Sequence, residues 1–544
     1  MKKISVLALA ASMAACGGSG VDGGMFAGGT GGSSVLLQTT DTGGTIPGAS
    51  GATPATPATP AMPGSPGSGA TPATPATPAT PAAGAPGATP PAVVTPAPGA
   101  ITPATQSAAA FLAAAYQDGL AEIRLAELAQ TRAESSGVKE YASAMIEQHT
   151  IVNGQILQLA QQKSVTLPTD VTAEQAAEVT RLSALSGLQF DRDYMWQNVI
   201  THRTDLAEAM RQARSSDDLN ARYFAAIAAP LLKTHLAFGE DLLQRLDPAA
   251  FVAFTYQASL AEVEWAEVAL DRATDEDVRR FAQSMIDEHT AANARITEFS
   301  ADKALPLPAE INPEQQVIAE DLARFTGADF DRAYMDVNVV AHAKAARAAR
   351  TQMSGDGLDV DVRGLARSLG PDLAGHLLRA SELARNITPS FLYSAAQSNL
   401  AEIRLGYLGA LRSTDVGISG FGQRMANDHT PVQVQIEQLA QSLNVVLPIE
   451  LSPEQQLAYS ALVTAQGQAF DAGFAAYNER LHDEAIERYT EETLRPTNAQ
   501  TQAFAQSQLP VLTAHRADVR TLLSGLGGQV QTVLQQIQAL RDVL

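Results

Sequence analysis

The chain contains nine histidines, and their spacing sorts them into three equivalent sets. Three glutamates and most of the histidines recur at intervals of 140 residues, and the last histidine of each set shifts by one because the second copy has a longer turn. The recurring positions are Glu122, His149, His202 and His235, then Glu262, His289, His342 and His376, then Glu402, His429, His482 and His515. Imidazole and carboxylate together suit Zn, Cu, Fe or Ni. Each set is therefore a candidate metal site.

Helices must position these residues, because the apolar residues around them follow a helical period. His149 and His235 both continue runs of apolar residues at alternating steps of four and three, so each lies on an apolar helix face. Glu122 and His149 are equally distant from a turn signal at residues 135–137, so antiparallel helices bring them level. His202 and His235 fit less well, since a turn near residue 216 leaves His235 about 7 Å too far along at 1.5 Å per residue.

Each repeat is predicted to hold four long helices with one long connection. A short helix is expected in that connection, beginning at Thr172, Asn312 and Ser452, each with a glutamine three residues later. Aspartates at equivalent positions, such as Asp191, are expected to cap the third long helix. This arrangement is typical of ferritin-like proteins. The predicted fold is all-α, with three tandem ferritin-like four-helix bundles at residues 107–248, 249–388 and 389–526.

Four short signatures recur in the same order in each repeat. They are Ala-Glu in the first helix, Gln, Glu or Asp before His-Thr in the second, Gly-x-x-Phe-Asp before the third and Pro-x-x-x-x-His in the fourth. Together they resemble the bacterial domain of unknown function 4142, over residues 107 to about 524. The resemblance implies ferritin-like domains of secreted or outer-membrane proteins and specifies no reaction.

The recurring residues allow two interpretations. One is a metal site inside each bundle, with Asn198 and its equivalents supporting the ligands. The other is a hydrogen-bonded polar core, in which a histidine satisfies the buried carboxylate without any metal. A di-iron centre fits poorly, because it needs glutamates three residues before histidines and only Glu479 has that place. In the third copy, Tyr407, Asn427 and Pro431 depart from the pattern and put its site in doubt.

The first residues have the layout of a secretory signal. Lys2 and Lys3 precede an apolar stretch that ends in Met13-Ala14-Ala15-Cys16, which resembles a bacterial lipoprotein cleavage box. The resemblance implies removal of residues 1–15 and lipidation of Cys16, and Gly17 is similar to lipoproteins sorted to the outer membrane. The alternative is an ordinary signal peptide with a coincidental cysteine. Since Cys16 is the only cysteine, lipidation leaves none for disulfides or catalysis.

Residues 16–106 are predicted to form a disordered tether. Of the 29 prolines, 16 lie before residue 107, among Gly, Ser and Thr with almost no charge. Such a composition cannot bury a core. At the other end, residues 529–544 are predicted to form an amphipathic helix, which packs on the third bundle or associates with another chain.

The net charge and the motifs restrict the classes of function that this protein can have. Lys and Arg number 37 against 58 Asp and Glu, a net charge of −21 that argues against nucleic acid as a partner. The sequence carries no complete catalytic signature. The expected protein is anchored by Cys16 in the cell envelope, in the outer membrane, facing the periplasm or the cell surface. Its expected role is a non-catalytic binding or structural module, and the alternative is a metal-binding or metal-dependent redox or stress protein.

Overall fold

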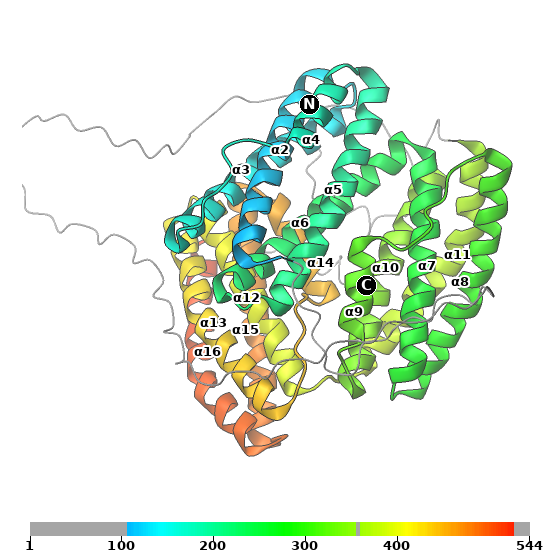
Figure 1. Cartoon of the computed structure of the whole chain (residues 1–544). Coiled ribbons are helices and arrows are strands. Elements are labelled where there is room, and N and C mark those ends of the chain that lie inside the picture. Colours follow the sequence, from blue (N-terminus) through cyan, green and yellow to red (C-terminus); the bar gives the residue numbers. More distant parts are fainter. Residues whose placement is uncertain (1–105, 355–358, 527–544) are drawn as a thin grey trace, which may run out of the picture. The chain divides into compact units, whose positions relative to one another are not determined.

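The described part of the chain consists of helices joined by turns and loops. The computed structural model describes residues 106–354 and 359–526, and these contain fifteen helices and no strand, which confirms the all-α class (Figure 1). The predicted signal peptide, Cys16, the tether up to residue 105 and the C-terminal segment 529–544 lie outside the described residues. None of the described helices is both long enough and apolar enough to span a membrane.

Each repeat contains four long helices and one short one. The first repeat has α2 (Ala108–Arg132), α3 (Ser136–Lys163), short α4 (Ala173–Ser183), α5 (Gly187–Ser215) and α6 (Leu219–Leu246). The second has α7 (Pro248–Arg272), α8 (Glu276–Lys303), short α9 (Pro313–Leu322), α10 (Gly327–Ser354) and α11 (Val360–Asn386). The third has α12 (Phe391–Arg412), α13 (Val416–Leu443), short α14 (Pro453–Thr464), α15 (Gly467–Leu494) and α16 (Ala499–Gly525).

The long helices of a repeat pack as two hairpins against each other. In the first repeat, α2 pairs with α3 and α5 pairs with α6, while α2 also packs on α5 and α3 on α6. The second repeat shows the same arrangement, with α7, α8, α10 and α11 side by side in green (Figure 1). The short helix sits in the long connection between the hairpins. This is the four-helix arrangement with one long crossover that the sequence predicted.

The short helices begin where the sequence predicted, and the same local chemistry starts all three. Thr172, Asn312 and Ser452 each accept a hydrogen bond from the backbone N–H three residues later, and the glutamine there bonds back to the cap residue. Each of these capping boxes satisfies two backbone donors that the first turn leaves free. The predicted capping boxes are thus confirmed.

Two separate apolar clusters stabilise each bundle. In the first repeat, one cluster contains Leu125 near the α2–α3 turn and the other contains Leu112 near the start of α2. Glu122 lies between these two leucines along α2 and is 2% exposed. The corresponding neighbours of His149 along α3 are Met145 and Ile156. The second and third repeats have paired clusters of the same kind. A buried polar layer therefore crosses the middle of each bundle.

Asp191 holds the α2–α3 turn rather than capping its own helix. Its carboxylate accepts hydrogen bonds from the backbone N–H groups of Glu134 at 3.1 Å and Ser135 at 2.8 Å. Asp331 does the same in the second repeat, at Thr274 and Asp275. The expectation that these aspartates cap the third long helix is wrong for both, because the turn offers free backbone donors within reach. They fix the register between the two hairpins.

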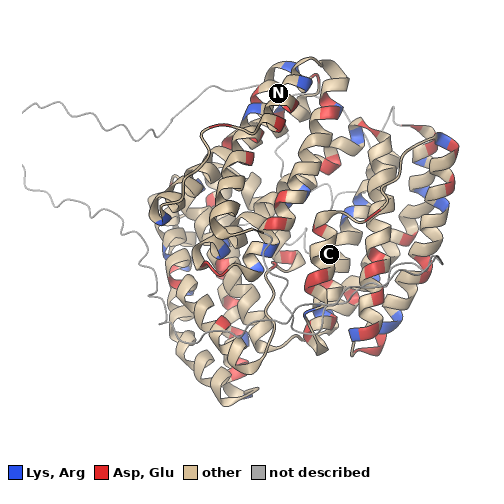
Figure 2. Ribbon diagram, in the orientation of Figure 1, with Lys and Arg blue, Asp and Glu red and all other residues tan. Residues whose placement is uncertain are grey.

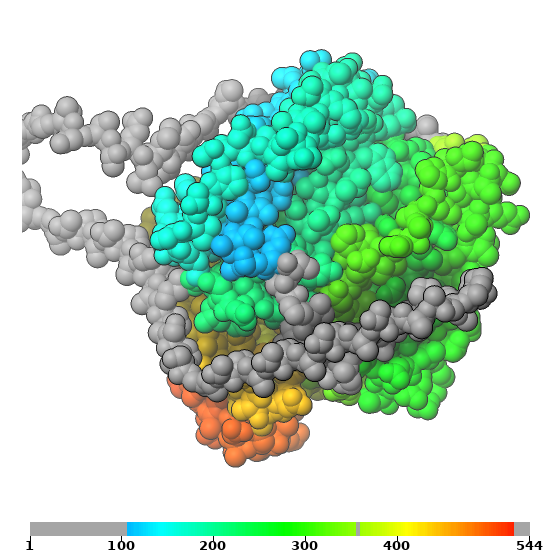
Figure 3. Space-filling model, in the orientation of Figure 1, coloured from blue at the N-terminus to red at the C-terminus, as the bar shows by residue number. Residues whose placement is uncertain are grey.

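The outer helix faces carry the charge. Acidic and basic residues both occur along the helices of the second repeat (Figure 2). In the space-filling view, the atoms of that repeat, in green, form a continuous region of the visible face (Figure 3). Exposed charge on these faces is consistent with a solvated surface, whereas the unusual ionisable groups are the buried ones.

Candidate metal centre

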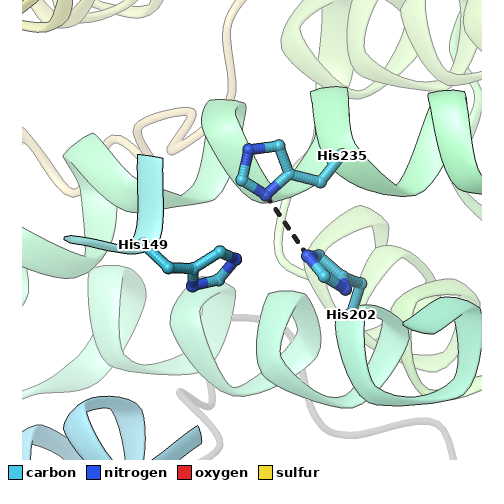
Figure 4. Close-up of side chains that lie close together, drawn as sticks. All are labelled: His149, His202 and His235. Carbon is cyan, nitrogen blue, oxygen red and sulfur yellow. Dashed lines mark hydrogen bonds between the residues drawn. The ribbon is translucent and has the colours of Figure 1, made fainter. Parts of the chain in front are cut away.

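Three histidines of the first repeat meet inside the bundle. His149 comes from α3, His202 from α5 and His235 from α6, and their rings converge on one point (Figure 4). Their ring centroids lie 5.3 to 5.7 Å apart, and Nε2 of His202 lies 3.2 Å from Nδ1 of His235. All three are buried, with exposures of 7%, 0% and 2%.

The other two repeats build the same cluster. His289, His342 and His376 have ring centroids 5.0 to 5.5 Å apart, and Nε2 of His289 lies 3.4 Å from Nε2 of His342. In the third repeat the corresponding centroids are 5.3 to 5.8 Å apart. The residues of that third cluster are His429, His482 and His515. In every repeat, one nitrogen from each histidine lies within 4.8 Å of the other two. The third copy thus keeps the arrangement despite its departures in sequence.

A backbone carbonyl fixes the proton on the α5 histidine. Nδ1 of His202 lies 2.9 Å from the carbonyl oxygen of Asn198, one turn earlier on the same helix. A carbonyl can only accept, so Nδ1 carries the hydrogen and Nε2 of the neutral ring keeps a free lone pair. His342 and His482 make the same bond, at 2.9 and 2.8 Å. His202, His342 and His482 therefore all offer Nε2.

The α6 histidine is oriented by the residue that precedes the α3 histidine. Nε2 of His235 donates to the side-chain oxygen of Gln148. Its counterparts His376 and His515 face carboxylates instead, Glu288 at 2.7 Å and Asp428 at 2.9 Å. These oxygens accept the Nε2 hydrogen and leave Nδ1 free as a ligand atom.

The histidine of the second long helix has a partner on the first helix in two repeats, at His289 on α8 and His429 on α13. Nδ1 of His289 lies 2.9 Å from Oγ of Ser259, which itself donates to the carbonyl oxygen of His289. Nδ1 of His429 lies 2.7 Å from Oδ1 of Asn399. Both acceptors leave Nε2 of the histidine free. The equivalent position in the first repeat is Gly119, which has no side chain to offer.

In the second and third repeats these bonds direct a lone pair of each histidine toward the other two, and in the first repeat they do so for His202 and His235. Five of the cluster nitrogens are buried without any hydrogen-bond partner in the described structure; they are Nε2 of His149, His429 and His482 and Nδ1 of His376 and His515. Leaving a buried polar atom unpaired costs about 1–3 kcal/mol. Two nitrogens bound to one metal at about 2.0–2.1 Å lie about 3.3–3.6 Å apart. The observed separations of 3.2 and 3.4 Å are close to that range.

Burial keeps these histidines neutral, which is the form that binds a metal. Desolvation lowers the pKa of His149 to about 3 and that of His202 to about 4. Burial, with the neighbouring histidines, also holds the pKa of His235 well below its usual range. At neutral pH, the cluster is therefore a set of unprotonated imidazoles.

The three glutamates lie behind His202 on α5, His342 on α10 and His482 on α15, outside the group of converging nitrogens. Oε1 of Glu122 lies 3.6 Å from Nδ1 of His202, the nitrogen that faces away from the cluster, and Oε2 of Glu122 has no partner in the described structure. The same distance is 3.6 Å for Glu262 and 3.2 Å for Glu402. Burial raises the pKa of all three glutamates well above the usual value. Of each predicted set, the structure brings the three histidines together and places the glutamate next to them.

His235 lies level with His202 in the cluster, although the turn predicted near residue 216 placed His235 too far along its helix. The connection between α5 and α6 spans residues 216–218, so its centre lies closer to the midpoint of His202 and His235 than the turn predicted near residue 216. Pro230 lies inside α6, one turn before His235. A proline inside a helix bends it, and together these features bring His235 level.

Sequence reasoning gave no role to Gln148, Glu288 and Asp428. A signal was present, because the residue before each α3-type histidine is always Gln, Glu or Asp. The pattern does not identify the partner of this residue, because the residue accepts a hydrogen bond from a histidine 87 or 88 positions away in the sequence.

Fold and site together define a tandem array of helical bundles, each with a buried tri-histidine cluster. The chain belongs to the family described as Domain of unknown function (DUF4142), which matches it three times, at residues 94–242, 243–383 and 384–522. The resemblance and the three tandem copies are thereby confirmed. Comparison with curated proteins gave no match, and comparison with solved structures gave none either.

Proposed function

We propose that this protein is a cell-envelope module that binds one transition metal ion in each bundle through three histidines. The observation that carries the proposal is the convergence of three buried histidines in every repeat, with one ligand nitrogen of each within 4.8 Å of the other two. Imidazole ligands suit Zn, Cu, Fe and Ni. On losing its proton, the glutamate behind His202, His342 or His482 would offset part of the charge of the ion.

Burial supports binding rather than turnover. A tetrahedral ion held by three histidines keeps its fourth position open, which is the pattern of catalytic zinc sites, so the case for binding without turnover rests on burial. The histidines of the first cluster are at most 7% exposed, and the apolar clusters lie above and below them. The proposed role is therefore to hold a metal, as a non-catalytic module.

The proposed location follows from the sequence of the first residues. A lipid on Cys16 would anchor the chain in the outer membrane, and the Pro-rich tether would carry the bundles away from it. The bundles would then face the periplasm or the cell surface. Labelling with a radioactive fatty acid tests this, since a Cys16→Ser variant should take up no label and remain soluble.

Elemental analysis of the full chain tests the metal proposal. After supplementation with Zn²⁺ and removal of free ions, we expect a stoichiometry near three. A variant carrying His202→Ala, His342→Ala and His482→Ala should retain no tightly bound metal. Thr204→Ala is a matched control, because Thr204 is exposed two residues beyond His202 on α5. No bound metal in the parent protein would contradict the proposal.

A further inference from the structure

We infer that the three metal sites are not equivalent, and that the second and third bind their ion more tightly than the first. This inference rests on the proposed function. The ligand histidines are the same in all three repeats, but the groups that hold those histidines differ. The first repeat lacks two supports that the other two possess.

The first difference lies at the fourth-helix histidine. Glu288 and Asp428 accept the Nε2 hydrogen of His376 and His515 with a carboxylate, whereas Gln148 offers His235 a neutral amide oxygen. A carboxylate behind a ligand histidine makes the imidazole a better donor to the metal and fixes its orientation. The second and third sites therefore contain a carboxylate–histidine pair that the first does not.

The second difference lies at the second-helix histidine. Ser259 and Asn399 accept a hydrogen bond from the non-ligating nitrogen of His289 and His429. The first repeat has Gly119 at this position, and a Cβ there would lie 2.3 Å from Oδ1 of Asn153. Asn153 thus occupies the space in which a supporting side chain would lie. This observation is independent of the first and points the same way.

One feature of the first repeat acts in the opposite direction. Asp118 and Asp205 lie near Glu122 and are a source of negative charge around the first site, which burial reduces by raising the pKa of both aspartates. Their influence acts over a longer distance than a direct hydrogen bond to a ligand. We expect the direct partners of the histidines to decide the order of affinity.

Titration of the full chain with Zn²⁺ against a chromophoric chelator tests the inference. We expect two tight equivalents and one that binds about 10–100-fold more weakly, the range typical of lost outer-shell partners. A His149→Ala variant should lose the weak equivalent, and His289→Ala should lose a tight one. Circular dichroism checks that both variants remain helical.

Exchange of the supporting groups tests the cause. Gln148→Glu should bring the weak site close to the tight class, and Glu288→Gln should move one tight site about tenfold or more toward the weak class. Asp287→Asn is the matched control, because this exposed neighbour on α8 loses the same charge without contacting His376.

The outcomes distinguish failure of the inference, that the site affinities differ, from failure of the proposed function, that the bundles bind metal. Three equal affinities, or equal effects of Glu288→Gln and Asp287→Asn, would overturn the inference and leave metal binding intact. A weak site in the second or third repeat would also overturn it. Failure of the parent chain to bind any Zn²⁺ would overturn the proposed function, and the inference with it.

Discussion

Nε2 of His202 faces Nδ1 of His235 across 3.2 Å, within hydrogen-bond distance (Figure 4), although the other partners of both rings hold their protons on the far side. The carbonyl of Asn198 holds the proton of His202 on the far side of its ring, and Gln148 does the same for His235. Two lone pairs directed at each other in a buried site repel. A cation between them removes that repulsion, and this is the physical basis of the proposed metal site.

Metal should stabilise the protein against unfolding. Zn²⁺ at a concentration of 100 times the dissociation constant is expected to add about 2.7 kcal/mol per site, since the unfolded chain lacks the assembled cluster. Thermal unfolding followed by circular dichroism measures the effect. The triple variant at His202, His342 and His482 should show no such shift, and an equal shift in both proteins would place the ion elsewhere.

Acid should destabilise the metal-free protein. The pKa of His149 is lowered to about 3, from about 6.5 in an unfolded chain, so its contribution is complete above pH 6.5 and is lost as pH falls toward 3. Glu122 acts the other way, because its pKa is raised, but in the first bundle the pKa is lowered for three histidines, His149, His202 and His235. The free energy of unfolding should fall by about 1.4 kcal/mol per pH unit for each net proton.

Chemical denaturation between pH 7 and pH 4.5 measures this dependence. A variant with His149→Gln should show a shallower slope, because one histidine no longer titrates on unfolding. A stability that is constant between pH 7 and pH 4.5 would show that the histidines are not buried in neutral form.

Glu122→Gln should separate metal affinity from stability. The substitution keeps the size of the side chain and removes the carboxylate behind His202, so we expect Zn²⁺ affinity in the first repeat to fall about tenfold. Stability without metal should be unchanged or higher, because a buried carboxylate is costly to ionise. Glu127→Gln is the control on the outer face of α2. Equal affinities in the two variants would contradict a role for Glu122 at the site.

Asp191→Ala should destabilise the first bundle by about 1–3 kcal/mol, because the backbone donors of Glu134 and Ser135 lose their acceptor. Urea denaturation measures the loss. Asp193→Ala removes an exposed ion pair with Arg181 from the same helix and should cost about 0–1 kcal/mol. Similar losses in both variants would mean that Asp191 does not hold the turn.

The repeats, helices and caps could be predicted because they depend on local patterns. Thr172 with Gln175 is a cap signal within four residues, and the spacing of His149 from apolar neighbours is helical over a few turns. The partners of the site could not be predicted in this way. Gln148 bonds to His235 across 87 positions, and the acceptor for His202 is the backbone of Asn198 rather than its side chain. Sequence gives residue types at a helix face, but not which nitrogen of each ring faces the centre.

X-ray absorption spectroscopy of the Zn²⁺-loaded full chain tests the central claim most directly. We expect a first shell dominated by three imidazole nitrogens at about 2.0–2.1 Å, with the outer-shell scattering typical of histidine rings. A first shell made only of oxygen atoms would show that the ion binds to surface carboxylates, and would contradict convergence of the histidines on a metal.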